Sequence, residues 1–292
     1  MQSAGDEYWG KKVDAVYDTI LMTKDNETLF ILWTASLDGN YYRLYRTFHI
    51  PTKTLGDIYP NHLKVEDDVV DFNITDMVNV FAEHKIGCKK IYTDIGIMQK
   101  LSTRKENGRT YYYSGAYCGD CNFIIKSEDL ITWQYVSQPT FINNSQWENA
   151  VYVVDDKCYY FVRQWKEKKE DENDLLEEVK EYGFLTFYDL NKKIWADPVL
   201  IEDCQSRSDF IMYNGELYLF HAPIDREHIC IVHINRQDLS KSKVVLQANM
   251  GESCFYPYIQ YIGDDVMGFS YTCNRQHIKF SQFYPGKYLL NE

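Results

Sequence analysis

Short runs rich in Tyr, Phe, Ile, Leu and Val recur along most of the chain, and clusters of Asn, Asp and Gly separate them. Residues 210–221 show the pattern clearly, because the dipeptide Asn214-Gly215 divides two such runs and a turn at 223–227 precedes a third. Asn-Gly between apolar runs is a strong signal for a β-hairpin. The pattern therefore predicts an all-β chain built from hairpins of short strands.

These hairpin units repeat along the sequence. The unit at 209–234 aligns without gaps with residues 258–283, and Arg226 falls on Arg275 at an offset of 49 residues. Three further units align with small gaps, at 16–50, 96–126 and 150–190. Repeats of this length are typical of the four-stranded blades of a β-propeller.

We therefore predict a single β-propeller domain over residues 1–292. Its blades are expected to be four-stranded and antiparallel, with five blades favoured and six as the alternative. Residues 63–92 are less regular, and extra strands or a sixth blade are the alternatives there. The stretch at about 165–181 is rich in Lys, Glu and Asp, which predicts a solvated insertion between strands.

Aromatic residues make up 16% of the chain, with 25 Tyr, 15 Phe and 6 Trp. Tyr and Phe favour pleated, half-buried surfaces, so strand packing is the simpler explanation of this excess. Tyr and Trp also stack well on sugar rings, and Trp147 and Tyr258 are our candidates for that role. The net charge of −12 argues against nucleic acid and anionic membranes as partners. A local arginine cluster can still bind an anionic ligand.

The chain has no apolar run of about 18 residues, so no membrane insertion is predicted. The opening segment MQSAGDEYWGKK lacks the apolar core of a signal peptide. This predicts a cytoplasmic chain as written, with a secreted or periplasmic one as the alternative if a leader was removed. The sequence leaves the oligomeric state open.

No cofactor is predicted. The sequence has neither a P-loop nor a GxGxxG motif after a strand, so it gives no sign of nucleotide binding. Cys118 and Cys121 have the spacing of a zinc half-site, but no second CxxC or His pair is present to complete it.

In a propeller, the first strand of each blade lies nearest the central channel, so residues near its start surround the funnel mouth. Five such positions are expected to form one site: Asp14 or Asp18, Asp94, Glu148, Arg207 and Tyr256. Carboxylates that converge in a half-enclosed site can divide acid and base roles between them. The alternatives are that the aspartates are turn residues and that Glu148 pairs with a nearby arginine.

Three further arginines are candidates for ligand binding. Arg163 ends an aromatic strand, where a guanidinium is costly unless it is paired. It is expected either to pair with Glu148 or another carboxylate, or to bind an anionic ligand. Arg226 and Arg275 occupy equivalent hairpin tips, and a repeated turn residue is their alternative explanation.

Three segments resemble the sialidase superfamily: Trp147–Arg163, Ser206–Arg226 and Cys254–Arg275. By this resemblance, Glu148 would polarise the nucleophile Tyr256, while Arg163 and Arg226 would hold a substrate carboxylate. The turn SEDLITW at Ser127–Trp133 also resembles the Asp-box of that superfamily, one residue short and without its glycine. The family's first-blade arginine has no counterpart in Asp14–Ile20, and Arg207 is the candidate to replace it.

A second resemblance is to the five-bladed furanosidases and fructosidases and to related mannoside phosphorylases. These place one carboxylate on each of the first three blades, as Asp14 or Asp18, Asp94 and Glu148 would be. Glu148 would then be the general acid, the first-blade aspartate the base or nucleophile, and Asp94 a positioning group.

Both resemblances imply a carbohydrate ligand. Our leading hypothesis is a glycoside-hydrolase-like propeller acting on an anionic sugar, and the three-carboxylate enzyme is the first alternative. The second alternative is a non-catalytic propeller that binds sugars or proteins.

Overall fold

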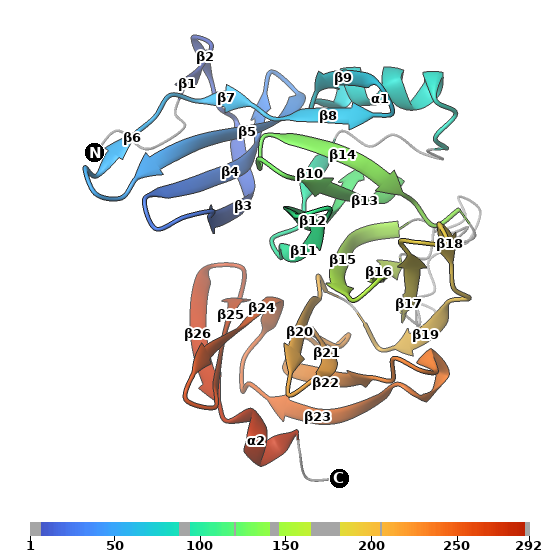
Figure 1. Ribbon diagram of the computed structural model, residues 1–292. Coiled ribbons are helices and arrows are strands. Elements are labelled where there is room, and N and C mark those ends of the chain that lie inside the picture. Colours follow the sequence, from blue (N-terminus) through green and yellow to red (C-terminus); the bar gives the residue numbers. More distant parts are fainter. Residues whose placement is uncertain are drawn as a thin grey trace, which may run out of the picture. The chain divides into compact units, whose positions relative to one another are not determined.

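The structure is a computed structural model, and it describes residues 7–87, 94–119, 121–140, 146–164, 182–204 and 206–289. Within these residues nearly every element is a β-strand (Figure 1), which confirms the all-β prediction. The chain divides into two compact units, Met1–Phe141 (unit 1) and Ile142–Glu292 (unit 2). The predicted insertion at about 165–181 lies outside the described residues, and the single-domain assignment stays a prediction.

The first sheet of unit 1 is an antiparallel meander built on three long strands. They are β3 (Ala15–Thr23), β4 (Thr28–Leu37) and β5 (Asn40–His49), and the short β6 (Thr54–Leu55) and β7 (Tyr59–Pro60) both pair with β5. A separate hairpin, β1 (Glu7–Tyr8) and β2 (Lys11–Lys12), precedes this sheet. The three long strands match the first predicted repeat unit.

The second sheet contains the irregular region of the sequence. Its meander consists of β10 (Ile95–Ile97), β11 (Ser102–Glu106), β12 (Arg109–Cys118), β13 (Cys121–Ser127) and β14 (Thr132–Ser137). The hairpin of β8 (His62–Val65) and β9 (Asp68–Asp71) extends this sheet, because β8 pairs in parallel with β14. Residues 62–71 therefore enlarge an existing sheet, and the sixth blade predicted as an alternative for this region is wrong.

Helix α1 (Ile74–Glu83) follows that hairpin. The side chain of its N-cap residue Asn73 accepts a hydrogen bond from the Asp76 amide at 3.0 Å, which satisfies one of the free amides of the first turn. Met77, Val80 and Phe81 lie on the buried face of the helix and join the core of the second sheet. The spacing of these three residues matches the helical period.

Unit 2 contains three sheets that follow one another along the chain (Figure 1). The first consists of β15 (Gln146–Val154), β16 (Lys157–Gln164), β17 (Tyr182–Asp189), β18 (Ile194–Trp195) and β19 (Val199–Glu202). The second consists of β20 (Asp209–Tyr213), β21 (Glu216–His221), β22 (His228–Ile234) and β23 (Lys243–Asn249), with a 3-10 turn at Leu239–Lys241 before β23. The third consists of β24 (Cys254–Gly263), β25 (Val266–Cys273) and β26 (His277–Phe283), and helix α2 (Pro285–Tyr288) follows it.

The number of full blades differs from the prediction. Four sheets reach at least four strands, with five, seven, five and four strands in chain order, whereas the last sheet has three in the described residues. The expected five or six four-stranded blades are therefore corrected to four. The repeat itself is confirmed, since β22 and β26 begin and end 49 residues apart, at His228 and His277 and at Ile234 and Phe283.

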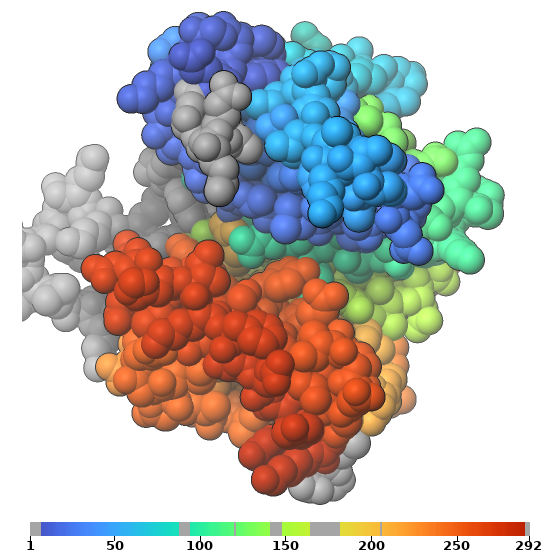
Figure 2. Space-filling model, turned by 90° about the vertical axis from the view of Figure 1, so that its left-hand side faces the viewer, coloured from blue at the N-terminus to red at the C-terminus, as the bar shows by residue number. Residues whose placement is uncertain are grey.

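The last two sheets of unit 2 share one hydrophobic core. Phe220 and Ile231 of the earlier sheet belong to the same buried cluster as Ile259 and Phe269 of the later one. In Figure 2 their residues, in orange and red, form one continuous surface. Among the described residues, no helix is long and apolar enough to cross a membrane.

The turn at Ser127–Trp133 is held by its own side chains. Asp129 Oδ1 accepts hydrogen bonds from the amides of Ile131 and Thr132, each at 2.8 Å, and Ser127 Oγ accepts one from Leu130 at 2.9 Å. Trp133 is fully buried in the core of the second sheet. These hydrogen bonds therefore fix the conformation of the connection between β13 and β14, which pair in the same sheet.

Candidate active site

The first strands of three sheets contain a β-bulge near their starts. The pairing register shifts after Tyr17 in β3, after Trp147 in β15 and after Phe255 in β24. In each bulge the next residue has a positive φ: 53° at Asp18, 50° at Glu148 and 54° at Tyr256. All three are residues that the sequence predicted for the site.

Such a backbone is unfavourable for residues other than Gly, Asn and Asp, and it costs about 1–3 kcal/mol where the surroundings impose it. Bulges redirect a side chain out of the regular alternation of a strand. Asp18 and Glu148 are each 7% exposed, so both carboxylates are directed to buried places. Asp14, the other first-blade candidate, is exposed and lies before β3. Of these two candidates, Asp18 is the buried one and the one that lies on a bulge.

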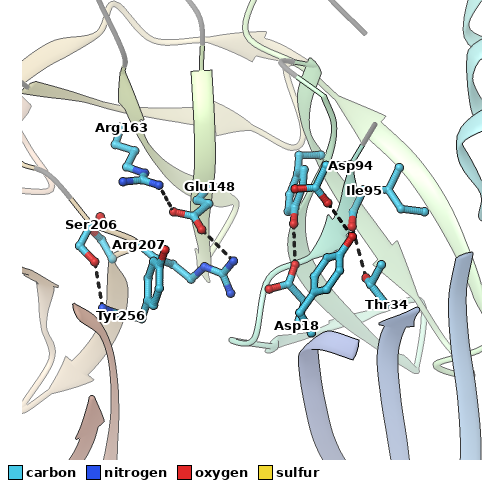
Figure 3. Close-up of polar contacts among 12 residues, drawn as sticks. Asp18, Thr34, Asp94, Ile95, Glu148, Arg163, Ser206, Arg207 and Tyr256 are labelled. Carbon is cyan, nitrogen blue, oxygen red and sulfur yellow. Dashed lines mark hydrogen bonds and ion pairs between the residues drawn. The ribbon is translucent and has the colours of Figure 1, made fainter. Parts of the chain in front are cut away.

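In unit 2, Glu148 lies between two guanidinium groups (Figure 3). Its Oε2 is 2.5 Å from Arg163 Nη2, and its Oε1 is 3.0 Å from Arg207 Nη2. The exposed fractions of these side chains are 7% for Glu148, 5% for Arg163 and 12% for Arg207. The Arg207 contact is a hydrogen bond that Arg207 donates, and the Arg163 contact is an ion pair. Arg163 thus pairs with Glu148, which is the first of the two roles predicted for it from the sequence.

Arg207 connects Glu148 to Tyr256. Its guanidinium carbon lies 5.2 Å from the centroid of the Tyr256 ring, within the range of a cation–π contact. In the described part of the chain, Glu148 is joined to Tyr256 through Arg207 and not directly. The cluster of Glu148, Arg163, Arg207 and Tyr256, called the Glu148 cluster below, draws on strands β15, β16 and β24 and the segment before β20.

The segment that carries Arg207 also holds the Tyr256 bulge. The bulge removes the Tyr256 amide from the β24–β25 ladder, and Ser206 Oγ accepts its hydrogen at 2.9 Å (Figure 3). The next residue, Pro257, has no amide hydrogen to satisfy. Asp209 Oδ2 accepts from the amide of Ile259 at 2.9 Å, although Ile259 has re-entered the ladder. Ser206 and Asp209 therefore fix the part of β24 on which Tyr256 depends.

Two predicted ligand-binding arginines lie against Phe255, the residue before Tyr256. The guanidinium carbons of Arg226 and Arg275 are 4.5 Å and 5.4 Å from the centroid of its ring. The rings of Phe255 and Tyr256 are 6.3 Å apart, so both arginines lie near the Glu148 cluster. Tyr258 is half-buried, and burial together with the charge of Asp209 raises its pKa to about 12.

Unit 1 contains a second group of acidic side chains. Asp18 Oδ2 accepts a hydrogen bond from the Tyr117 hydroxyl at 2.6 Å, and Asp94 Oδ1 accepts one from the Tyr17 hydroxyl at 2.9 Å (Figure 3). Burial and the neighbouring Asp94 charge raise the pKa of Tyr17 well above its usual value. Asp18 and Asp94 are therefore each held by a phenol donor.

The backbone around these aspartates is tightly packed. Arg43 is fully buried and donates a hydrogen bond to the Asp18 carbonyl at 2.7 Å, which anchors the bulge. A Cβ atom at Gly96 would lie 2.3 Å from Asp18 Oδ2 and 2.4 Å from the Tyr117 ring. Only glycine at 96 leaves room for the contact between Asp18 and Tyr117.

The other predicted residues have plain outcomes. Trp147 lies in β15, but its side chain is outside the described residues. Cys118 and Cys121 face each other across the β12–β13 turn, and no group of three His, Cys, Asp or Glu in the described ranges could hold a metal ion.

Five residues that support the candidate sites were not among the sequence predictions. They are Tyr17, Arg43, Tyr117, Ser206 and Asp209. One signal pointed to the bulges: an aromatic residue directly precedes Asp18, Glu148 and Tyr256. The supporting contacts join residues far apart in the chain, and no local pattern marks them.

Comparison with known proteins gives no family. No family model matches the chain, and no curated protein matches it. Among solved structures, a β-1,2-mannobiose phosphorylase from Listeria innocua is 9% identical, with a TM-score of 0.48, and the match covers 97% of this chain and 93% of that one.

Two other similar structures are longer proteins. A xylan β-1,4-xylosidase from Bacillus halodurans is 14% identical over 67% of this chain and 42% of its own, with a TM-score of 0.45. An exo-β-1,3-galactanase from Phanerochaete chrysosporium is 10% identical over 62% and 46%, with a TM-score of 0.44. This chain thus matches less than half the length of either enzyme. Likeness this distant assigns neither a family nor an activity to the chain.

Proposed function

We propose that this protein acts on a carbohydrate at the Glu148 cluster. The observation that carries the proposal is the bridge through Arg207, which joins a buried carboxylate and a half-buried tyrosine that two equivalent bulges position. Backbone strain of this kind gathers at functional sites. The cluster offers a carboxylate acceptor, guanidinium donors and an aromatic ring, which together suit the hydroxyls and apolar faces of a sugar.

An anionic sugar is the more specific form of the proposal. Arg163, Arg207, Arg226 and Arg275 bring four positive charges to this region, and Glu148 is the carboxylate that pairs with two of them. A ligand carboxylate could bind one of these guanidinium groups through two hydrogen bonds. In the sialidase-like mechanism, the Tyr256 oxygen would bond to the anomeric carbon as the bond from that carbon to the aglycone breaks. The phenol would lose its proton and the departing aglycone oxygen would gain one, while Glu148 would act on Tyr256 through Arg207.

Replacing Arg207 by lysine tests the proposal, because lysine keeps the charge but loses the planar group that stacks on Tyr256. We expect Arg207→Lys to bind 3′-sialyllactose at least ~10-fold more weakly than the wild type, a loss of about 1.4 kcal/mol. Arg236→Lys is the matched control, since Arg236 pairs with Asp155 away from the cluster. Affinities are measured by calorimetry. Equal affinities of the two variants for 3′-sialyllactose would contradict the proposal that the Glu148 cluster binds the sugar.

A further inference from the structure

The hairpin β1–β2 presents an exposed tryptophan on unit 1. Its two-residue turn is Trp9-Gly10, with φ values of 54° and 72°. Two successive positive φ values define a type I′ turn, in which Asn or Asp is favoured at the first position. A tryptophan there is strained, because its Cβ crowds the backbone in this conformation. This hairpin is therefore less stable with Trp9 at the first turn position than it would be with Asn or Asp there.

The indole is held in place yet remains accessible. Its ring centroid is 3.9 Å from that of Tyr8 and 5.4 Å from that of Tyr42, whose ring is nearly perpendicular to it. Tyr8 is buried in a core cluster with Trp33 and Leu44, so it anchors the hairpin. Trp9 nevertheless keeps 58% of its surface exposed. In Figure 2 the residues of this N-terminal part, in dark blue, lie at the surface of unit 1.

Polar side chains lie in and next to the two neighbouring turns, at Lys11, Asp38 and Asn40. Lys11 Nζ is 2.7 Å from Asp38 Oδ2, which joins this turn to the β4–β5 turn, and both side chains are more than half exposed. Asn40 donates from its amide to the Tyr42 hydroxyl at 3.1 Å. The two-residue turns are Trp9-Gly10 and Asp38-Gly39, and Lys11 and Asn40 directly follow them. A protein-binding surface would instead present a contiguous apolar patch.

We propose that Trp9 is a binding platform for a neutral sugar ring of an oligosaccharide. The apolar face of a pyranose would stack on the indole, and the ring hydroxyls would meet Lys11, Asp38 and Asn40. The platform belongs to unit 1 and is independent of the proposed function at Glu148. It would bind a chain through its sugar units and carry out no chemistry.

The variant Trp9→Asn tests this directly. It creates Asn-Gly, the favoured type I′ turn, so the hairpin is kept while the indole is removed. Titrations with cellohexaose, xylohexaose and mannohexaose use the Glu148→Gln protein, so that turnover does not consume the ligand. We expect at least one hexasaccharide to bind saturably in isothermal titration calorimetry, and Trp9→Asn to weaken that binding at least ~10-fold. Tyr59→Ala, which removes another half-exposed aromatic ring, should leave the affinity unchanged.

Two results would overturn the platform. One is equal affinity in Trp9→Asn and in the Glu148→Gln parent. The other is no saturable binding of any of the three hexasaccharides, by the parent or by the wild type. Neither result bears on the proposed function, because Arg207→Lys tests that with a different ligand.

Discussion

Glu148 and Tyr256 have a backbone conformation that these residue types rarely adopt, and Asp18 has the same conformation. Each of the three follows an aromatic residue. The sequence repeat pointed to all three as site candidates, since they lie near the starts of repeat units. It did not separate Asp14 from Asp18, because both precede an apolar run. In the structure, Asp18 lies on a bulge and Asp14 does not. The Arg43 side chain, from another strand, donates a hydrogen bond to the Asp18 carbonyl and so holds the bulge.

His221 is a second buried residue with a measurable consequence. It ends β21 with 1% of its surface exposed, and burial lowers its pKa from the usual 6.5 to about 4. The unfolded chain binds a proton here between those pH values, whereas the folded protein does not. The stability that this site contributes is therefore complete above pH 6.5, falls as the pH drops toward 4, and is lost below it.

This predicts a free energy of unfolding that falls by roughly 2–3 kcal/mol more in the wild type than in His221→Gln between pH 7.5 and pH 4.5. Urea unfolding at the two pH values measures the difference. The exposed His277 provides the control, and His277→Gln should follow the wild type. If wild type and His221→Gln lose the same stability on acidification, His221 titrates normally in the fold.

Among the elements, the repeat units were the most predictable from sequence, because turn residues and apolar runs alone define them. The hairpins of β21–β22 and β25–β26 lie where the offset of 49 residues placed them. The region at 62–71 could not be placed, because β8 joins its sheet through a parallel pairing with β14, some 70 residues later. Pairings of that kind leave no periodic signal.

The segment between β19 and β20 is the element on which the Glu148 cluster depends most. It supplies Arg207. It also supplies Ser206, whose hydroxyl accepts a hydrogen bond from the Tyr256 amide that is left outside the strand ladder by the β24 bulge. Removing that acceptor leaves a partly buried amide unsatisfied, at a cost of up to about 3 kcal/mol. We expect Ser206→Ala to lose stability in that range and to speed hydrogen exchange at the Tyr256 amide.

Ser253→Ala is the matched control, because Ser253 Oγ accepts the Asn274 amide at an exposed turn of the same sheet. Exchange at Tyr256 should be unchanged in that variant. Equal exchange at Tyr256 in wild type and Ser206→Ala would mean that another group holds the bulge.

For the whole molecule, the fold class followed from periodicity, while the number of full sheets did not. Four sheets have four or more strands and the last has three in the described residues, a difference that hairpin counting cannot detect. The net charge of −12 is likewise a property of the whole chain, yet arginines gather around Phe255, Tyr256 and Glu148. The proposed site for an anionic sugar depends on these local guanidinium groups in a chain of negative net charge.

The most direct test of the central claim is turnover of chromogenic glycosides, one sialoside and a set of neutral hexosides and furanosides, by wild type, Glu148→Gln and Tyr256→Phe. Each variant removes one function and keeps the size of the side chain, and circular dichroism checks folding. We predict turnover of the sialoside and its loss in both variants. Turnover of a neutral glycoside that Tyr256→Phe retains, or no turnover of any substrate, would contradict the account.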